Sequence, residues 1–197
     1  MFKRLLLATG NKGKLTELRQ FFGTEIEIIG LDTFPTIIEV EETSDTFQGN
    51  ARLKAVGYAR QTGELTLADD SGLSVKALGG RPGVMSARYG GDITFAERMS
   101  LLLDELGTDA ADRSAQFECA MCVAAPDGSI MAEETGICSG TIAPKPVGIY
   151  GFGYDPVFIP TGFKDTFGVL DEDVKQKISH RADAFLKILP KIRSFCS

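Results

Sequence analysis

The stretch FKRLLLATGNKGKLTELRQFF, residues 2–22, decides the fold class of this chain. Residues 2–9 carry a short apolar run and predict a buried strand. The GNKG segment that follows is a glycine-containing loop, and Leu15, Leu18 and Phe22 then recur at helical spacing. We therefore expect a strand–loop–helix unit at the start of an α/β domain.

Further elements follow along the chain. Strands are expected at residues 25–31, 64–70, 72–78, 114–125, 129–138 and 155–160. Helices are expected over 46–62, closed by Gly63, over 94–106 with a Thr94–Glu97 capping box, and from the N-cap Ser179 to the residue before Pro190. This order predicts an α/β or α+β domain with a mixed sheet flanked by helices. Without repeats or linker-like segments, residues 1–197 are expected to form a single domain.

Composition narrows the class of partner. The formal net charge is −6, and the sequence contains 43% hydrophobic and 24% charged residues. This acidic balance argues against a nucleic-acid polymer as the main partner but permits a small anionic ligand in a local cationic pocket. The first apolar run is too short for a secretion signal, and no stretch is long enough to span a membrane. A cytoplasmic protein is expected.

The four cysteines, at positions 119, 122, 138 and 196, do not predict a metal site. The CAMC spacing has no second pair to complete a zinc site, and it lies in an apolar strand pattern. We expect structural burial.

The loop TGNKGK, residues 9–14, is a candidate phosphate-binding segment. A strand that enters a glycine-rich loop and then a helix offers backbone N–H groups and the positive end of the helix dipole. Lys12 and Lys14 add positive charge. The loop is not a Walker A motif, because Ala8 and Leu15 stand where that motif needs Gly and Ser or Thr.

Four carboxylates could complement that loop. Glu41 and Glu42 precede a helix, and Asp69 and Asp70 end a strand. Mg²⁺ prefers one or two carboxylates together with water and phosphate oxygens, and it would relieve repulsion between adjacent acids. No serine, cysteine or histidine nucleophile is evident, so metal-assisted attack by water is the simplest mechanism.

A cationic segment lies near the C-terminus. KQKISHR contains the only histidine, His180, next to Arg181 in the first helical turn, with Lys175 and Lys177 just upstream. Cations at a helix N-terminus oppose the helix dipole, and a bound anion would remove that conflict. These residues are candidates for binding phosphate or another oxyanion.

Taken together, the segments resemble the inosine triphosphate pyrophosphatase family. The matching stretches are ATGNKGKLTEL, EETSDTFQGNARLKA, LADDSGLSVKALGGRPGVMSARY, GFGYDPVF and KISHR, in the family's order over about residues 8–181. The resemblance implies an elongated mixed β-sheet flanked by helices, with two lobes around a central substrate cleft, and a homodimer. It also implies Mg²⁺-dependent hydrolysis of ITP, dITP and XTP to the nucleoside monophosphate and pyrophosphate.

Site roles follow from the resemblance position by position. Asp70 matches the proton acceptor, and Glu41 with Asp70 matches the metal ligands. The positions that match substrate-binding residues are Thr9, Gly10, Asn11, Lys12, Gly13, Lys14, Ser71, Phe152, Gly153, Tyr154, Asp155, Lys175, His180 and Arg181. Asp69 is expected to support Asp70, and the choice between Glu41 and Glu42 at the metal stays open.

The sequence departs from the family pattern at a few positions. Gly49 stands where Glu is common, Ser44 where Gly is usual, and Tyr150 where a small residue is usual. Residues 166–175 also differ. Two other functions remain open: a pyrophosphatase for modified pyrimidine or methylated nucleotides, and a nucleotide-binding protein without catalytic activity. The four acids argue against the latter, because carboxylates repel a polyphosphate unless a metal intervenes.

Overall fold

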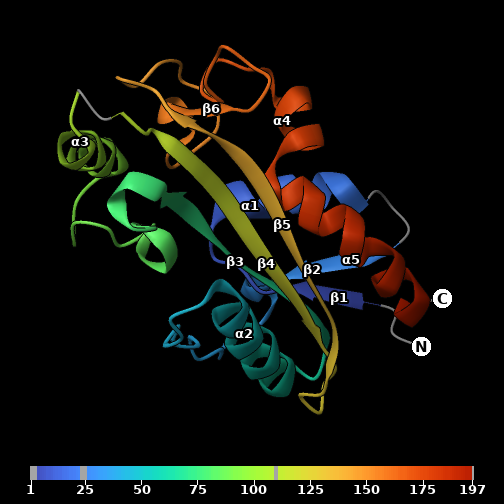
Figure 1. Cartoon of the computed structure of the whole chain (residues 1–197). Helices are drawn as coiled ribbons and strands as arrows, with labels where there is room; N and C mark the ends of the chain where they lie inside the picture. The colour runs from blue at the N-terminus through green and yellow to red at the C-terminus, as the bar shows by residue number, and fades with distance from the viewer. Residues whose placement is uncertain (1–3, 23–25, 109–110, 197) are drawn as a thin grey trace. The chain divides into compact units, whose positions relative to one another are not determined.

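The computed structural model describes residues 4–22, 26–108 and 111–196, without the side chains of Lys12, Gln20 and Phe21. The strands are β1 (Arg4–Leu7), β2 (Glu27–Gly30), β3 (Leu65–Val75), β4 (Ser114–Ala124), β5 (Ile130–Ile142) and β6 (Phe158–Pro160). The helices are α1 (Lys12–Phe22), α2 (Phe47–Thr62), α3 (Phe95–Leu106), α4 (Glu172–Ile178) and α5 (His180–Cys196). Figure 1 shows these elements along the chain.

The strands form one sheet in the order β2-β1-β3-β4-β5-β6. β1 pairs in parallel with both neighbours, with Leu5 opposite Ile28 on one side and Leu65 on the other. β5 and β6 are antiparallel. The sheet is therefore mixed, and the predicted α/β class is confirmed.

Contacts divide the chain into two compact units. Unit 1 comprises Met1–Asp70, Cys119–Gly136 and Asp183–Ser197, and unit 2 comprises Ser71–Glu118 and Ile137–Ala182. Strands β3, β4 and β5 each contribute residues to both units. The single-domain organisation stays a prediction.

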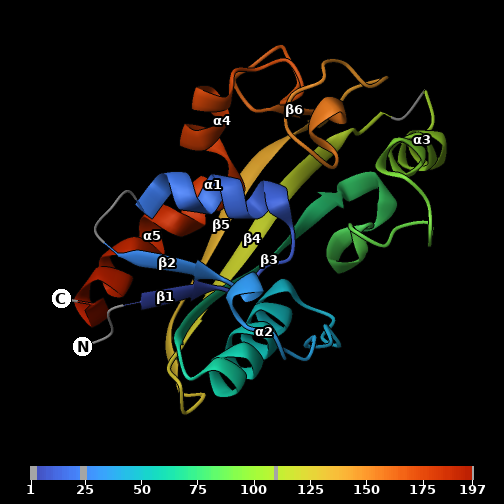
Figure 2. The same ribbon diagram turned by 180° about the vertical axis from the view of Figure 1, so that it is seen from behind.

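The core of unit 1 lies between its strands and helices α1 and α5. These helices lie side by side in Figures 1 and 2, and the Phe22 and Phe185 rings meet edge to face at 4.8 Å. Leu5, Leu67 and Ile188 belong to the same buried cluster. Alternation along β3 directs Leu65 and Leu67 to this cluster and Thr66 and Ala68 to the opposite face.

The core of unit 2 is aromatic. The Phe158 ring contacts Phe117 and Phe167, with centroids 4.6 and 5.6 Å apart. Arg113 donates to the carbonyl oxygens of Gly107, Ile142 and Ala143, and so ties the end of α3 to the end of β5.

Helix caps agree with the sequence. Thr46 caps α2, which ends at Gly63 with a positive φ of 71°. The Thr94–Glu97 capping box begins α3. The Ser179 side chain accepts from the Ala182 N–H at 3.1 Å, as expected for an N-cap.

The C-terminal region differs from expectation. Helix α4 was not expected, and the prediction that the last helix stops before Pro190 is wrong, because α5 continues to Cys196. Proline removes the hydrogen bond to the carbonyl four residues earlier, here that of Leu186. Pro190 and Leu186 are both exposed, so water can satisfy that carbonyl.

Two expected strands are shorter than predicted. Residues 76–78 and 155–157 form 3₁₀ turns. Residues 2, 3 and 25 of two other predicted strands lie outside the described residues.

Buried cysteines were correctly predicted. Each cysteine is a thiol, and Cys119, Cys122 and Cys138 are buried. Cys119 and Cys122 lie three positions apart on β4, so they point to opposite faces of the sheet and cannot act as a pair. Burial raises the pKa of Cys122 to about 12.

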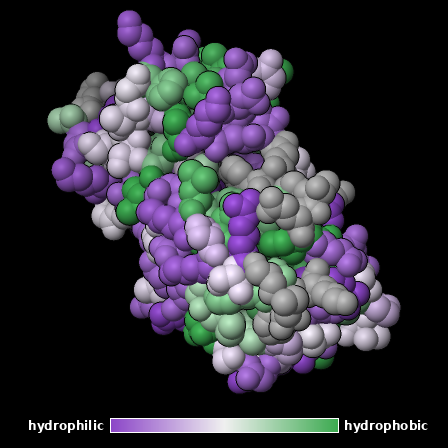
Figure 3. All heavy atoms as spheres, turned by 90° about the vertical axis from the view of Figure 1, so that its right-hand side faces the viewer, coloured by the Kyte–Doolittle hydropathy of each residue, from purple (hydrophilic) through white to green (hydrophobic). Residues whose placement is uncertain are grey.

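Exposed apolar side chains are scattered in separate small areas on the face shown in Figure 3. Across the whole described chain they include Ile38, Ile149 and Leu186. Among the described residues, no helix is both long and apolar enough to cross a membrane.

Candidate active site

The predicted phosphate loop connects β1 to α1 in unit 1. The Ala8 N–H donates to the Leu67 carbonyl at 2.8 Å, which holds the start of the loop alongside β3. Asn11 caps α1, because its Oδ1 accepts from the N–H groups of Gly13 and Lys14 at 2.9 and 3.2 Å. Two of the N–H groups expected to face a phosphate are therefore held by Asn11.

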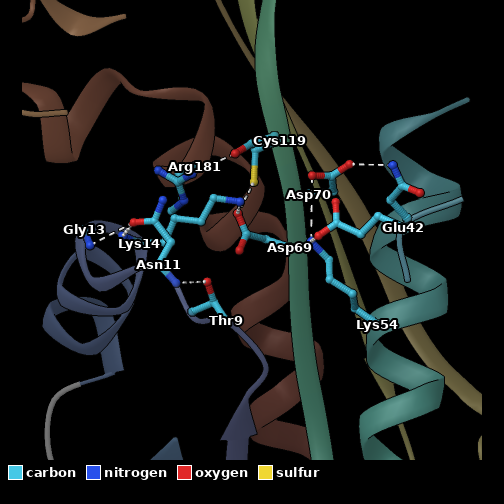
Figure 4. Close-up of polar contacts among 12 residues, drawn as sticks. Thr9, Asn11, Gly13, Lys14, Glu42, Lys54, Asp69, Asp70, Cys119 and Arg181 are labelled. Carbon is cyan, nitrogen blue, oxygen red and sulfur yellow. Dashed lines mark hydrogen bonds and ion pairs between the residues drawn. The ribbon is translucent and has the colours of Figure 1, made fainter. Parts of the chain in front are cut away.

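Asp69 and Asp70 point to opposite sides of β3, as Figure 4 shows. Adjacent strand residues alternate between faces, so the two carboxylates do not share one environment. The Asp69 side chain is fully buried, and its Oδ2 lies 3.0 Å from Lys14 Nζ. It also accepts from the Cys119 thiol at 3.8 Å. Asp69 thus holds the lysine of the phosphate loop.

Asp70 faces α2. Its Oδ2 accepts from Asn50 Nδ2 at 3.0 Å, and its Oδ1 lies 3.8 Å from Lys54 Nζ. The same ammonium group donates to Glu42 Oε1 at 3.0 Å. Asp70 and Glu42 therefore flank one buried positive charge (Figure 4). We call Glu42, Asn50, Lys54 and Asp70 the α2 cluster.

Burial and charge act against each other in the α2 cluster. Burial raises the pKa of Asp70, although Lys54 and Lys14 oppose that shift. Burial alone would lower the pKa of Lys54, but Asp69, Asp70 and Glu42 together outweigh it and raise that pKa. A carboxyl with a raised pKa beside a lysine is suited to accept a proton next to a bound polyanion.

A hard divalent cation fits the donors of the α2 cluster. Asp70 and Glu42 already lie against one cationic group, the Lys54 ammonium, so both carboxylates can approach a single positive charge. Glu41, the predicted ligand, is exposed. Within the described ranges, no three His, Cys, Asp or Glu side chains gather as a metal site. A magnesium ion here would thus depend on substrate phosphates and water for its remaining ligands.

Sequence reasoning missed Asn50 and Lys54. The sequence pattern places both residues within the helix expected over 46–62 and gives neither a role. The signal was present: a lysine at a buried helical position needs an anionic partner, because an unpaired buried charge is costly.

The FGYD segment, residues 152–155, forms a buried ion pair with Lys175 in unit 2. Asp155 is 2% exposed, and its Oδ2 accepts from the Phe152 N–H and from Lys175 Nζ, both at 2.7 Å. The ammonium of Lys175 lies 4.6 Å from the centre of the Phe152 ring. Gly151 is required here, because a Cβ at that position would overlap the Asp155 carboxylate.

Arg181 and His180 occupy the first turn of α5 in the same unit. Arg181 is 1% exposed, donates to Ser71 Oγ at 2.9 Å, and lies 5.8 Å from the Phe152 ring centre. His180 stacks on Phe117 at 4.8 Å. Two cations therefore lie near Phe152, an arrangement suited to an aromatic ligand with oxygen acceptors.

Most predicted residues thus fall into two groups. Unit 1 joins Lys14 to Asp69, and links Asp70 to Glu42 through Lys54. Asn11 and Gly13 hold the start of α1. Unit 2 pairs Ser71 with Arg181 and Asp155 with Lys175, and both cations lie near the Phe152 ring. Tyr154 has a supporting place, since its hydroxyl donates to the Ser86 carbonyl at 3.0 Å. The side chain of Lys12 lies outside the described residues.

Comparison with known proteins agrees with the resemblance noted from the sequence. A 48% identical protein of Nostoc sp. is named dITP/XTP pyrophosphatase, and the alignment covers 100% of this chain and 98% of that protein. A protein of Synechocystis sp. with the same name is 49% identical, with 94% and 93% covered.

Solved structures agree as well. The structure of a HAM1 protein from Coxiella burnetii matches with a TM-score of 0.89 at 38% identity, over 98% of this chain and 100% of that one. The sequence profile of the Ham1 family matches residues 5–191. Since this match spans nearly the whole chain, the protein belongs to the Ham1 family.

Proposed function

We propose that this protein is a nucleoside-triphosphate pyrophosphatase that acts on ITP, dITP and XTP. The α2 cluster carries the proposal: a buried carboxylate with a raised pKa, Asp70, lies beside a second acid and a lysine. The full-length likeness to proteins named dITP/XTP pyrophosphatase supports the substrate class.

The proposed reaction adds water to the α-phosphorus. The bond between that phosphorus and the oxygen bridging to the β-phosphorus breaks, giving the nucleoside monophosphate and pyrophosphate. Asp70 accepts the proton of the attacking water, and the positive charges of Lys14 and Lys54 stabilise the charge on the phosphates.

Asp70 with Glu41 or Glu42 would hold Mg²⁺, which supplies charge neutralisation of the triphosphate when bound. The resemblance assigns Glu41, and the contact of Glu42 with Lys54 supports Glu42. Glu41→Gln and Glu42→Gln variants, each titrated with Mg²⁺ during turnover, distinguish the two, because loss of the ligand raises the Mg²⁺ concentration needed for half-maximal rate.

The residues around Phe152 are proposed to bind the purine. Phe152 offers an aromatic face, and Lys175 and Arg181 offer N–H donors for the oxygen at the purine six-position. Adenine carries an amino group there, and a buried donor left without an acceptor costs about 1–3 kcal/mol. ATP is therefore a poor substrate. The homodimer stays a prediction from the resemblance, and the cytoplasmic location stays a prediction from the sequence.

A substrate panel tests the proposal. ITP, dITP, XTP, GTP, ATP and 5-methyl-UTP are incubated with the enzyme and Mg²⁺, and pyrophosphate and orthophosphate are measured separately. We expect pyrophosphate from the first three. Equal rates with GTP and ITP would refute the proposed specificity for ITP, dITP and XTP. A preference for 5-methyl-UTP would favour a pyrophosphatase for modified pyrimidine nucleotides. Nucleotide binding that is insensitive to chelator, without pyrophosphate release, would favour a non-catalytic binding protein.

A further inference from the structure

Asn50 is buried between Asp70 and the segment that carries Glu42. Its side chain is 0% exposed and uses both ends of its amide. Nδ2 donates to Asp70 Oδ2 at 3.0 Å, and Oδ1 accepts from the Ser44 N–H at 2.9 Å. Neither bond serves the helix to which Asn50 belongs.

The polarity of these two contacts fixes the amide in one orientation. A backbone N–H can only donate, so it requires the amide oxygen, and a carboxylate accepts, so it requires the NH₂ group. Aspartate in this place would put a second carboxylate against Asp70. An apolar residue would leave the half-buried Ser44 N–H and the buried Asp70 without these partners, at a cost in stability.

The Asp70 contact has a consequence for the carboxylate as a whole. Because Asn50 holds Oδ2, the plane of the carboxylate is set and Oδ1 is directed toward Lys54. The Ser44 contact holds the chain two residues after Glu42, the other acid on Lys54. One buried side chain thus fixes both acids of the α2 cluster.

We infer that Asn50 is a positioning residue that orients Asp70 for the reaction. The inference rests on the proposed function of Asp70 and names a residue to which the resemblance assigned no role. Removal of the Asn50 side chain should slow the chemical step through Asp70 and leave substrate binding nearly unchanged.

Tyr58→Phe is a matched control. The Tyr58 hydroxyl accepts from the Val40 N–H at 3.2 Å, so it also ties helix α2 to the segment before it, at a place other than Asp70. Asn50→Ala removes both amide bonds, whereas Asn50→Asp keeps an acceptor for the Ser44 N–H and removes the donor to Asp70.

The test measures kcat and KM for XTP in these variants, alone and combined with Asp70→Asn. We expect both Asn50 variants to lower kcat at least ~10-fold, since small misplacements of a reacting group are costly. KM should change less than ~3-fold, and Asn50→Ala should cause no further loss in the Asp70→Asn background. Tyr58→Phe should retain the parental kcat.

Two kinetic outcomes would overturn the inference. Parental kcat in Asn50→Asp would show that only the Ser44 bond matters. An equal loss from Asn50→Ala with and without Asp70 would show a role independent of Asp70. Parental activity in Asp70→Asn alone would instead refute the proposed function of Asp70.

An NMR measurement on the metal-free protein tests the Asn50–Asp70 contact without kinetics, so it does not depend on whether the Asn50 variants fold. The side-chain NH₂ signals of Asn50 in a nitrogen-15 NMR spectrum report its acceptor directly. They should shift in Asp70→Asn, and they should stay in place in Tyr58→Phe. Unshifted signals in Asp70→Asn would mean that the contact does not exist in solution.

Discussion

Ser44 and Gly49, two departures from the family pattern, lie against each other at the start of α2. Ser44 Oγ accepts from the Thr46 N–H at 3.2 Å and lies 3.1 Å from Thr46 Oγ1. Thr46 is the N-cap, so Gly49 is the third helical residue, where a glutamate would normally accept from the N-cap N–H in a capping box. Ser44 Oγ therefore accepts from the N-cap N–H in place of a glutamate carboxylate at position 49.

The two positions are also sterically coupled. A Cβ on residue 49 would overlap Ser44 Oγ and lie 2.6 Å from Ser44 Cβ. A glutamate at position 49 and the Ser44 side chain cannot both occupy this space, so we expect the effects of Ser44→Gly and Gly49→Glu on stability to be strongly non-additive.

The magnitudes follow from the contacts. Ser44→Gly removes the hydrogen bond to the Thr46 N–H, at a cost of about 0.5–1.5 kcal/mol. Gly49→Glu forces a close contact that should lower the free energy of unfolding by about 1–3 kcal/mol. Replacing glycine, a poor helix residue, should return about 0.7–1 kcal/mol of this. In the double variant the contact with Ser44 is gone, only Thr46 Oγ1 at 2.9 Å from the new Cβ has to shift, and the introduced glutamate can complete the capping box. The double variant should lie within about 1 kcal/mol of the parent, giving a coupling of about 1–3 kcal/mol.

Urea unfolding of the four proteins measures this coupling, and thermal midpoints should follow at about 2–4 °C per kcal/mol for a chain of this length. Gly49→Ala is the control: it introduces the Cβ without the carboxylate, and should destabilise the parent but stabilise the Ser44→Gly protein. Effects that add within about 0.5 kcal/mol would refute the coupling.

Three further predictions concern Asp70, Lys54 and Asp112. Asp70→Asn should lower the rate of pyrophosphate release by at least ~10²-fold, because an amide cannot accept the proton, and a near-parental rate would remove Asp70 from the mechanism. Lys54→Met should lower kcat by at least ~10²-fold, because it leaves Asp70 and Glu42 without the positive charge between them. The control is Lys187→Met, which removes exposed contacts with Asp183 and the Thr135 carbonyl and should leave kcat nearly unchanged. Hydrogen bonds from Ser114 and the charge of Lys76 lower the pKa of Asp112 from its ordinary value of 3.8 to about 2. The stabilising effect of Asp112 is therefore complete above the pKa of the unfolded state and is lost as the pH falls through about 2. In Asp112→Asn, the thermal midpoint should fall less steeply with decreasing pH than in the parent. A thermal midpoint that falls as steeply as in the parent would contradict this.

The sequence predicted the elements whose signals are local. The caps of α2 and α3 and the strand–loop–helix at the N-terminus depend on residues close together in the chain. Helix α4 was missed because it has only seven residues, too few for an apolar stripe to recur. The extension of α5 past Pro190 was missed because the surroundings of Leu186 and Pro190 in the folded chain, where both residues are exposed, are not visible in the sequence.

The candidate site was only partly predictable for the same reason. Asp70 and Lys14 belong to recognisable segments, but the partners of these side chains come from other elements. That Lys54 stands between Asp70 and Glu42, or that Asn50 reaches Asp70, depends on how α2 packs against β3. Periodicity can show that Lys54 faces inward, but it cannot show what it meets.

The alternation of Asp69 and Asp70 on β3 makes this short segment intolerant of changes in length. A one-residue deletion within residues 65–68 would turn Asp70 toward the face of Lys14 and would move Asp69 to the α2 face, two positions before the place that Asp70 now holds. The composition of the strand would hardly change, yet no carboxylate of β3 would remain at the place that faces Asn50 and Lys54. Substitutions at either aspartate, by contrast, affect one face at a time. The two halves of the acidic pair can therefore diverge independently in sequence, while the number of residues between Leu65 and Asp70 has to stay constant.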